Sequence, residues 1–238
     1  MYKPTLLQET SSQQLRLTLN IEKVDELFPH FRLGDFAVLR GSSQPLINLL
    51  CVRAQLPCQL GGMGTNVVFI DGGNTFRLYD ISTIAQSYEL DPREILERIF
   101  ISRAFTAYQL TSLVLERLQK AIDAYDSKLV ILSNLAQLYL DTDIPKKEAQ
   151  EVFIQLTSYI SNFAKKNQVI VLVTNSNYSW SKQNKFLKEV LCARANVVAS
   201  IKKSNHRPQF VLEKHSQFNL GKVEFPSSEI TLMEFLRE

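Results

Sequence analysis

Short runs of apolar residues alternate along this chain with longer amphipathic segments, and this alternation restricts the fold more than any other feature. Val67–Ile70, Leu129–Leu132 and Val169–Val173 are continuous apolar runs, as found in strands buried on both faces of a sheet. Between them, Thr106–Tyr125 and Lys147–Ala164 carry apolar residues at helical spacing. Because such alternation is typical of βαβ units, the sequence predicts an α/β protein with a largely parallel central sheet flanked by helices.

The remaining elements complete this prediction. Further strands are expected at Phe36–Leu39 and Ile99–Ile101, and further helices at Leu46–Ala54, Asp91–Leu96 and Lys185–Ala193. Near the C-terminus, Val197–Ile201 and Gln209–Leu212 are separated by a polar, Pro-containing segment, which predicts an antiparallel hairpin that closes the sheet. No repeat or linker divides the chain. We therefore expect a polar N-terminal segment over residues 1–20 and one core domain over residues 21–238.

Composition excludes several classes of protein. No apolar run in the 238 residues approaches the roughly 18–20 residues that cross a bilayer, and the polar N-terminus lacks a signal-peptide core. The three Cys residues form no Cys-x-x-Cys pair, and the three His residues are scattered. The sequence thus predicts a cytoplasmic protein with reduced thiols, no membrane contact and no metal site.

Positive charge is concentrated near one end of the chain. The formal net charge is only +3, but the segment from Ser176 to His215 holds eight Lys and Arg against two Glu. That segment carries +6, which leaves −3 for the rest of the chain. Such asymmetry is typical of a surface that faces a polyanion, although an ordinary solvated lysine face would give the same count.

A glycine between a predicted strand and a predicted helix is the place where a phosphate loop is found. The phosphate-loop pattern is Gly-x-x-x-x-Gly-Lys-Ser/Thr. When its first glycine is aligned with Gly41, it covers Gly41, Ser42, Ser43, Gln44, Pro45, Leu46, Ile47 and Asn48. Only the first glycine is present. Ile47 takes the place of the lysine that neutralises phosphate, and Asn48 that of the hydroxyl that binds Mg²⁺.

Several later motifs, in order and spacing, resemble the RecA/RadA recombinase family, and most closely its archaeal and eukaryotic strand-exchange recombinases and their paralogues. The segments that carry the resemblance are Gln55-Leu56-Pro57, Gly61–Gly64, Val67–Arg77, Ser102–Phe105, Leu129–Leu132 and Val173-Thr174-Asn175. The resemblance covers essentially Leu19 to Phe225 and implies a RecA-like P-loop NTPase fold.

The departures from this family all concern one mechanism. Gly73 falls where the family has the Glu that activates water, and Ser133 falls where the Walker B Asp holds Mg²⁺. With Ile47 and Asn48, four positions lack the expected residues, and phosphoryl transfer depends on such positioned charge and metal. The resemblance therefore implies that the chain is not an active ATPase and uses no ATP or Mg²⁺ as cofactor. Asp71 matches the family and is expected to cap its own turn.

The resemblance also implies two DNA-binding loops. The first corresponds to Asp141–Lys147, which is short and half acidic. The second corresponds to Ser176–Lys185, where aromatic residues alternate with lysines, as in sites that bind single strands without sequence preference. The candidate DNA-binding residues are Tyr178, Trp180, Lys182, Lys185 and Lys188. Alternatively, Trp180 packs into the core and the lysines are simply solvated.

The function we predict from the sequence is that of a non-hydrolysing accessory protein in DNA recombination or repair. Its expected partners are single-stranded DNA, a recombinase or a paralogue of one. Two alternatives remain open. One is an ATPase that uses displaced residues, and the other is a protein-interaction or regulatory module with no nucleic-acid role.

Overall fold

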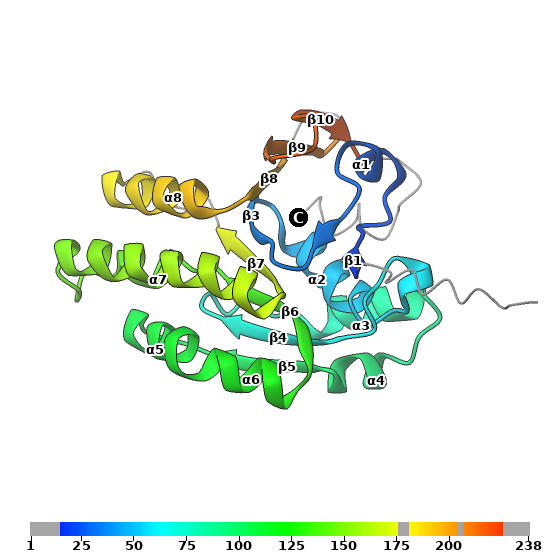
Figure 1. Ribbon diagram of the computed structural model, residues 1–238, viewed down its shortest axis with the longest axis horizontal. Coiled ribbons are helices and arrows are strands. Elements are labelled where there is room, and N and C mark those ends of the chain that lie inside the picture. The colour runs from blue at the N-terminus through cyan, green and yellow to red at the C-terminus, as the bar shows by residue number, and fades with distance from the viewer. Residues whose placement is uncertain (1–14, 176–180, 204–206, 226–238) are drawn as a thin grey trace, which may run out of the picture.

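A mixed sheet of eight strands forms the centre of the computed structural model, which describes residues 15–175, 181–203 and 207–225. The strands lie in the order β10-β9-β8-β3-β7-β6-β4-β5, and helices cover both faces (Figure 1). No helix among the described residues combines the length and the apolar content needed to cross a membrane. The predicted α/β class with a RecA-like arrangement is confirmed.

Six strands of the sheet run parallel to one another, and each of the last two pairs antiparallel with the strand before it. The parallel strands are β3 (Phe36–Gly41), β4 (Asn66–Asp71), β5 (Ile99–Arg103), β6 (Ser127–Ser133), β7 (Ile170–Asn175) and β8 (Val197–Lys202). β9 (Gln209–Lys214) pairs antiparallel with β8, and β10 (Gly221–Glu224) pairs antiparallel with β9. The predicted C-terminal hairpin is therefore present and is extended by one further strand.

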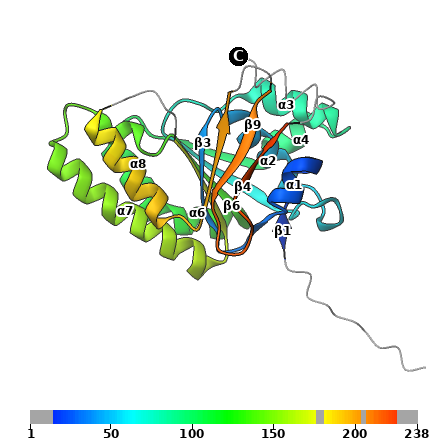
Figure 2. The ribbon, with the colours of Figure 1, turned by 90° about the horizontal axis from the view of Figure 1, so that it is seen from above.

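Two hydrophobic clusters hold the helices on the two faces of the sheet. Along β3, Ala37 and Leu39 belong to one cluster, whereas Phe36 and Val38 belong to the other, as the two-residue repeat of a strand requires. The first face carries α2 (Gln44–Arg53), α3 (Leu78–Ser87) and α4 (Pro92–Glu97). The second carries α5 (Ala107–Ser112), η2 (Leu113–Arg117), α6 (Leu118–Ala124), α7 (Lys146–Asn167) and α8 (Lys182–Arg194). Figure 2 shows α7 and α8 side by side.

Some elements were absent from the sequence prediction. They are α1 (Glu22–Leu27), α3, β10, two short helical turns η1 (Cys58–Leu60) and η3 (Gln137–Leu140), and a two-stranded sheet of β1 (Arg16–Leu17) and β2 (Phe31–Arg32). β1 and β2 have two residues each, which is too short for a detectable periodicity. Leu17 and Leu19 are nevertheless buried in the first cluster, so this segment contributes two side chains to the core.

A buried arginine attaches this N-terminal segment to the sheet. Arg53, at the end of α2, is 1% exposed. Its guanidinium donates to the Thr18 carbonyl at 2.7 Å, the Thr18 hydroxyl at 2.8 Å, the Leu60 carbonyl at 2.7 Å and the Tyr88 hydroxyl at 3.3 Å. Because the guanidinium itself is buried, these four acceptors supply the partners that its N–H groups would otherwise lack.

We expect Arg53→Met to lower the free energy of unfolding by about 3 kcal/mol, because it removes the hydrogen bonds that the guanidinium donates. Urea denaturation measures this change. The matched control is Arg93→Met, which removes an ion pair to Glu97 whose side chains are 85% and 65% exposed. That control should cost less than about 0.5 kcal/mol. Equal effects of the two substitutions would contradict a structural role for Arg53.

Candidate functional site

The carboxyl ends of the parallel strands place most of the predicted site residues along one edge of the sheet. β3 ends at Gly41, β4 at Asp71, β6 at Ser133 and β7 at Asn175. Since β4 and β6 pair with Asp71 opposite Ser133, these two side chains meet directly. In open α/β folds, ligands bind outside this edge, where strand order changes direction.

The connection between β3 and α2 is shorter than the phosphate-loop pattern. α2 begins at Gln44, so only Ser42 and Ser43 separate it from Gly41. The Ser42 amide donates to the Ile201 carbonyl at 3.3 Å, and the Ser43 amide donates to the Gly41 carbonyl at 2.9 Å. Pro45 has no amide hydrogen to offer. The backbone donors that would surround a phosphate are thus few, and two of them are used inside the protein.

The last two positions of the phosphate-loop pattern, Ile47 and Asn48, lie inside α2. Ile47 is fully buried in the first hydrophobic cluster, and Asn48 is 1% exposed. The Asn48 amide group donates to the Asp80 carboxylate at 3.2 Å, and its oxygen accepts from the Gln44 side chain at 3.0 Å. Both residues therefore serve the packing of α2 against the sheet and α3.

Gly41 is required by the sheet itself. Its φ is +75°, and a Cβ built there would lie 2.2 Å from the Ile201 carbonyl oxygen of β8. Any side chain would force β3 and β8 apart, since that oxygen is backbone. This glycine thus has a structural explanation that involves no phosphate.

Asp71 sits at the centre of a closed polar network. One carboxylate oxygen accepts from the Thr75 amide at 3.0 Å, the Gly73 amide at 3.2 Å and the Ser133 hydroxyl at 2.9 Å. The other oxygen accepts from the Phe76 amide at 3.0 Å. Burial alone would raise the pKa of the Asp71 carboxyl, but these hydrogen bonds outweigh it and hold the pKa below its ordinary value. The geometry is that of a carboxylate that caps its own turn, as expected.

Ser133 and Gly73 complete this network. Ser133 is fully buried, and its hydroxyl also lies 2.5 Å from the Thr75 hydroxyl. A Cβ built on Gly73 would lie 2.4 Å from the Asn134 side-chain nitrogen and 2.8 Å from the Asn134 Cβ. The Asn134 side chain therefore occupies the space that a catalytic Glu at position 73 would need.

The candidate DNA-binding residues lie partly outside the described part of the chain, which includes neither Tyr178 nor Trp180. Lys182 and Lys185 are exposed on α8, whose start is capped by Ser181 through the Asn184 amide at 3.1 Å. Lys188 is half-buried, and burial lowers the pKa of its ammonium group, as does the nearby charge of Arg40. The side chain of Gln183 donates to the Tyr139 carbonyl at 2.8 Å, which ties the start of α8 to the turn before Asp141–Lys147.

Sequence reasoning missed Arg40, Asn134, Gln183 and Glu213 as parts of this region. Arg40 directly precedes the glycine that ends β3, and Asn134 directly follows Ser133 at the end of β6. Their positions at strand ends were the available signal. No sequence signal identified Glu213 or Gln183, because the residues to which they hydrogen-bond are distant in sequence.

The strand order and the helices on both faces of the sheet define a RecA-like α/β protein. Comparison with known proteins agrees. Residues 9–195 match the Rad51 family, and the chain belongs to that family.

Among its relatives, the meiotic recombination protein DMC1 of Saccharomyces cerevisiae is 28% identical over 155 residues, which is 64% of this chain and 44% of the relative. The DMC1 homolog A of Oryza sativa subsp. japonica is 30% identical over 142 residues, 59% of this chain and 41% of the relative. The DNA repair and recombination protein RadA of Cenarchaeum symbiosum is 30% identical over 121 residues, 51% of this chain and 28% of the relative. The matched region thus spans less than half the length of these relatives.

We expect Gly73→Ala to destabilise the fold by about 1–3 kcal/mol, because the added methyl group collides with Asn134. Asn134→Gly removes the obstructing side chain, and its backbone φ of +49° suits glycine. In the double variant the cost of Gly73→Ala should fall by at least about 1 kcal/mol. Thermal denaturation of the four proteins completes this cycle, and strictly additive effects would show that the two positions do not touch.

Proposed function

We propose that this chain is a non-hydrolysing accessory member of the Rad51 family that acts in DNA recombination or repair by binding DNA, a recombinase, or both. The observation that carries the proposal is the short junction from β3 to α2, in which only Ser42 and Ser43 separate Gly41 from Gln44. The family match and the names of the relatives, which refer to meiotic recombination and DNA repair, support the pathway.

The chemistry of phosphoryl transfer supports the loss of hydrolysis. The reaction needs a lysine and a metal ion near the outer phosphates, and a group that orients the attacking water. At the positions assigned to these roles, Ile47 and Asn48 are buried in α2, Ser133 is a buried hydroxyl, and Asn134 covers Gly73.

We expect no release of phosphate from ATP above background, and no rise in melting temperature when ATP and Mg²⁺ are added. Asp71→Asn serves as the diagnostic variant, because Asp71 is the one acidic residue that matches the family at this edge. Phosphate release that the wild type shows and Asp71→Asn abolishes would refute the proposal and favour an ATPase with displaced residues.

Binding to single-stranded DNA is proposed to occur along α8. Lys182 and Lys185 are exposed, and the contact between Lys185 and Glu189 is long, at 3.9 Å, with side chains 80% and 65% exposed. Exposed pairs of this kind contribute little, so the lysines remain available to phosphates. Tyr178 and Trp180 are proposed to supply rings on which bases stack.

Replacing Lys182, Lys185 and Lys188 together by Gln should weaken binding to a labelled single strand equally for all sequences. Each lost phosphate contact should flatten the plot of log affinity against log salt by about 0.7, so the triple variant should flatten it by roughly 2. The control is Lys120, Lys165 and Lys166→Gln, which changes the net charge equally at exposed positions of α6 and α7. If both triple variants bind like the wild type at every salt concentration, α8 is not the site and the interaction-module alternative is favoured.

A further inference from the structure

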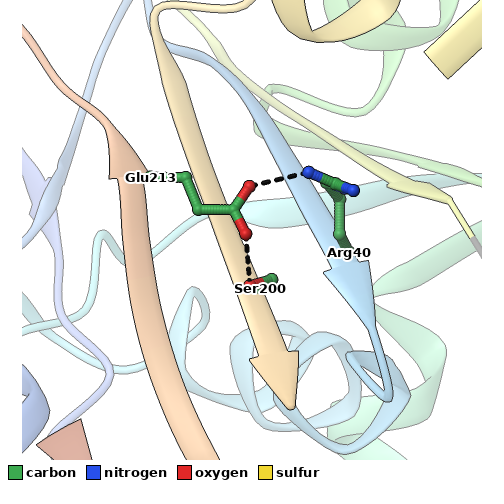
Figure 3. A network of polar contacts seen from close by, with 3 residues as sticks. All are labelled: Arg40, Ser200 and Glu213. Atoms are coloured by element: carbon green, nitrogen blue, oxygen red, sulfur yellow. Dashed lines mark hydrogen bonds and ion pairs between the residues drawn. The ribbon is translucent and has the colours of Figure 1, made fainter. Parts of the chain in front are cut away.

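A cluster of charged side chains lies between α8 and the strands beneath it. Arg40 of β3 donates through Nη1 to Glu213 Oε2 at 2.7 Å, and the Ser200 hydroxyl donates to Glu213 Oε1 at 2.7 Å (Figure 3). Arg40 and Ser200 are register partners on neighbouring strands. All three side chains lie on the face of the sheet that carries α8. Arg40 follows Phe36 and Val38 at two-residue intervals along β3, and both of these belong to the second hydrophobic cluster.

Two lysines bring further positive charge to this cluster. α8 packs against β3, and the pKa of the Lys188 ammonium group is lowered first by burial and then by the charge of Arg40. Lys214 of β9 donates to the carbonyls of Cys192 and Ala193 at 3.1 and 2.9 Å, at the end of α8. Arg40, Glu213, Lys188 and Lys214 all lie near the end of α8 at Cys192, so these four charged residues bring three positive charges and one negative charge to this region.

Arg40 has unused capacity to bind an anion. A guanidinium carries five N–H donors in a planar fork that matches phosphate oxygens. Glu213 accepts from Nη1, and Nε is buried, so the nitrogens that remain for an anion are those at the outer end of the guanidinium. The side chain is still 35% exposed, so its outer nitrogens can be reached from solvent.

The position of Arg40 continues the lysine row of α8. Lys182, Lys185 and Lys188 follow one another at intervals of three residues, so they lie near one face of the helix and lead toward Arg40. We propose that Arg40 and Lys188 form a phosphate-binding subsite at the end of β3, which takes a backbone phosphate of a single strand bound along α8, and that Glu213 competes for Arg40. This inference rests on the proposed function and adds to it a subsite that no motif includes.

The test compares two substitutions with opposite expected effects on a labelled single strand. Arg40→Gln should flatten the salt dependence by about 0.7, because one phosphate contact is lost. Glu213→Gln should steepen it by up to about the same amount and raise affinity, because it frees the guanidinium while its side-chain oxygen can still accept from Ser200. The controls with equal charge changes are Lys166→Gln and Glu151→Gln, both at exposed positions of α7. Melting temperatures establish that each variant is folded.

A second measurement does not depend on DNA binding. Phosphate stabilises proteins in general relative to chloride, so the expected sign of a site is that phosphate, at equal ionic strength, raises the melting temperature of the wild type and of Lys166→Gln more than that of Arg40→Gln. If the wild type binds no single strand but shows this phosphate effect, the subsite binds free phosphate and the proposed DNA-binding function is refuted. If DNA binding depends on the α8 lysines while Arg40→Gln and Glu213→Gln leave both salt dependence and phosphate effect unchanged, the subsite is overturned and the proposed function remains.

Discussion

The junction between β3 and α2 is the constraint on which the carboxyl edge of the sheet depends. β3 is hydrogen-bonded on both sides, to β7 and β8, and its last residue lies so close to the Ile201 carbonyl that only glycine fits there. Because α2 starts at Gln44, the chain turns from strand to helix through Ser42 and Ser43 alone. A longer loop is what allows backbone amides to surround a phosphate. The short turn instead brings the buried face of α2 directly onto the sheet.

The polar groups at the neighbouring strand ends are consistent with this arrangement. Asp71 accepts from three backbone amides and from Ser133, and Asn48 pairs with Gln44 and Asp80. A carboxylate so fully hydrogen-bonded by its own turn is stabilised in its charged form without a metal ion or another cation. The same interactions leave it little capacity to act as a general base, since its lone pairs are occupied.

Sequence periodicity was sufficient to predict the buried strands, because a strand covered on both faces has to be apolar throughout, as Val130–Leu132 and Val171–Val173 are. It placed the start of α2 at Leu46, two residues after its observed start, so Gln44 and Pro45 were expected in the loop that follows Gly41 although both belong to the helix. Loop length cannot be read from a pattern that has lost its second glycine. α3 was overlooked although Ile81, Ile84 and Ala85 have helical spacing, since its exposed start, Leu78 and Tyr79, obscures the amphipathic signal. The burial of Arg53 had no signal at all, because its acceptors are mostly backbone carbonyls and hydroxyls brought together by the fold.

The second half of the molecule holds its charged surface by different means. α8 is fixed near its first turn by the bond from Gln183 to the Tyr139 carbonyl and at its end by Lys214, whose ammonium group meets the carbonyls that a helix C-terminus leaves unpaired. Between these anchors, Leu187 and Leu191 are fully buried against the sheet. The row of lysines is therefore held in a fixed position relative to β3 and Arg40, so binding a polyanion there requires little ordering of the backbone. Affinity is greater when such ordering has already been accomplished by the fold. This edge of the sheet thus combines a carboxylate that is hydrogen-bonded by its own turn with a helix on which Lys182 and Lys185 are exposed, and both features support the proposed binding role.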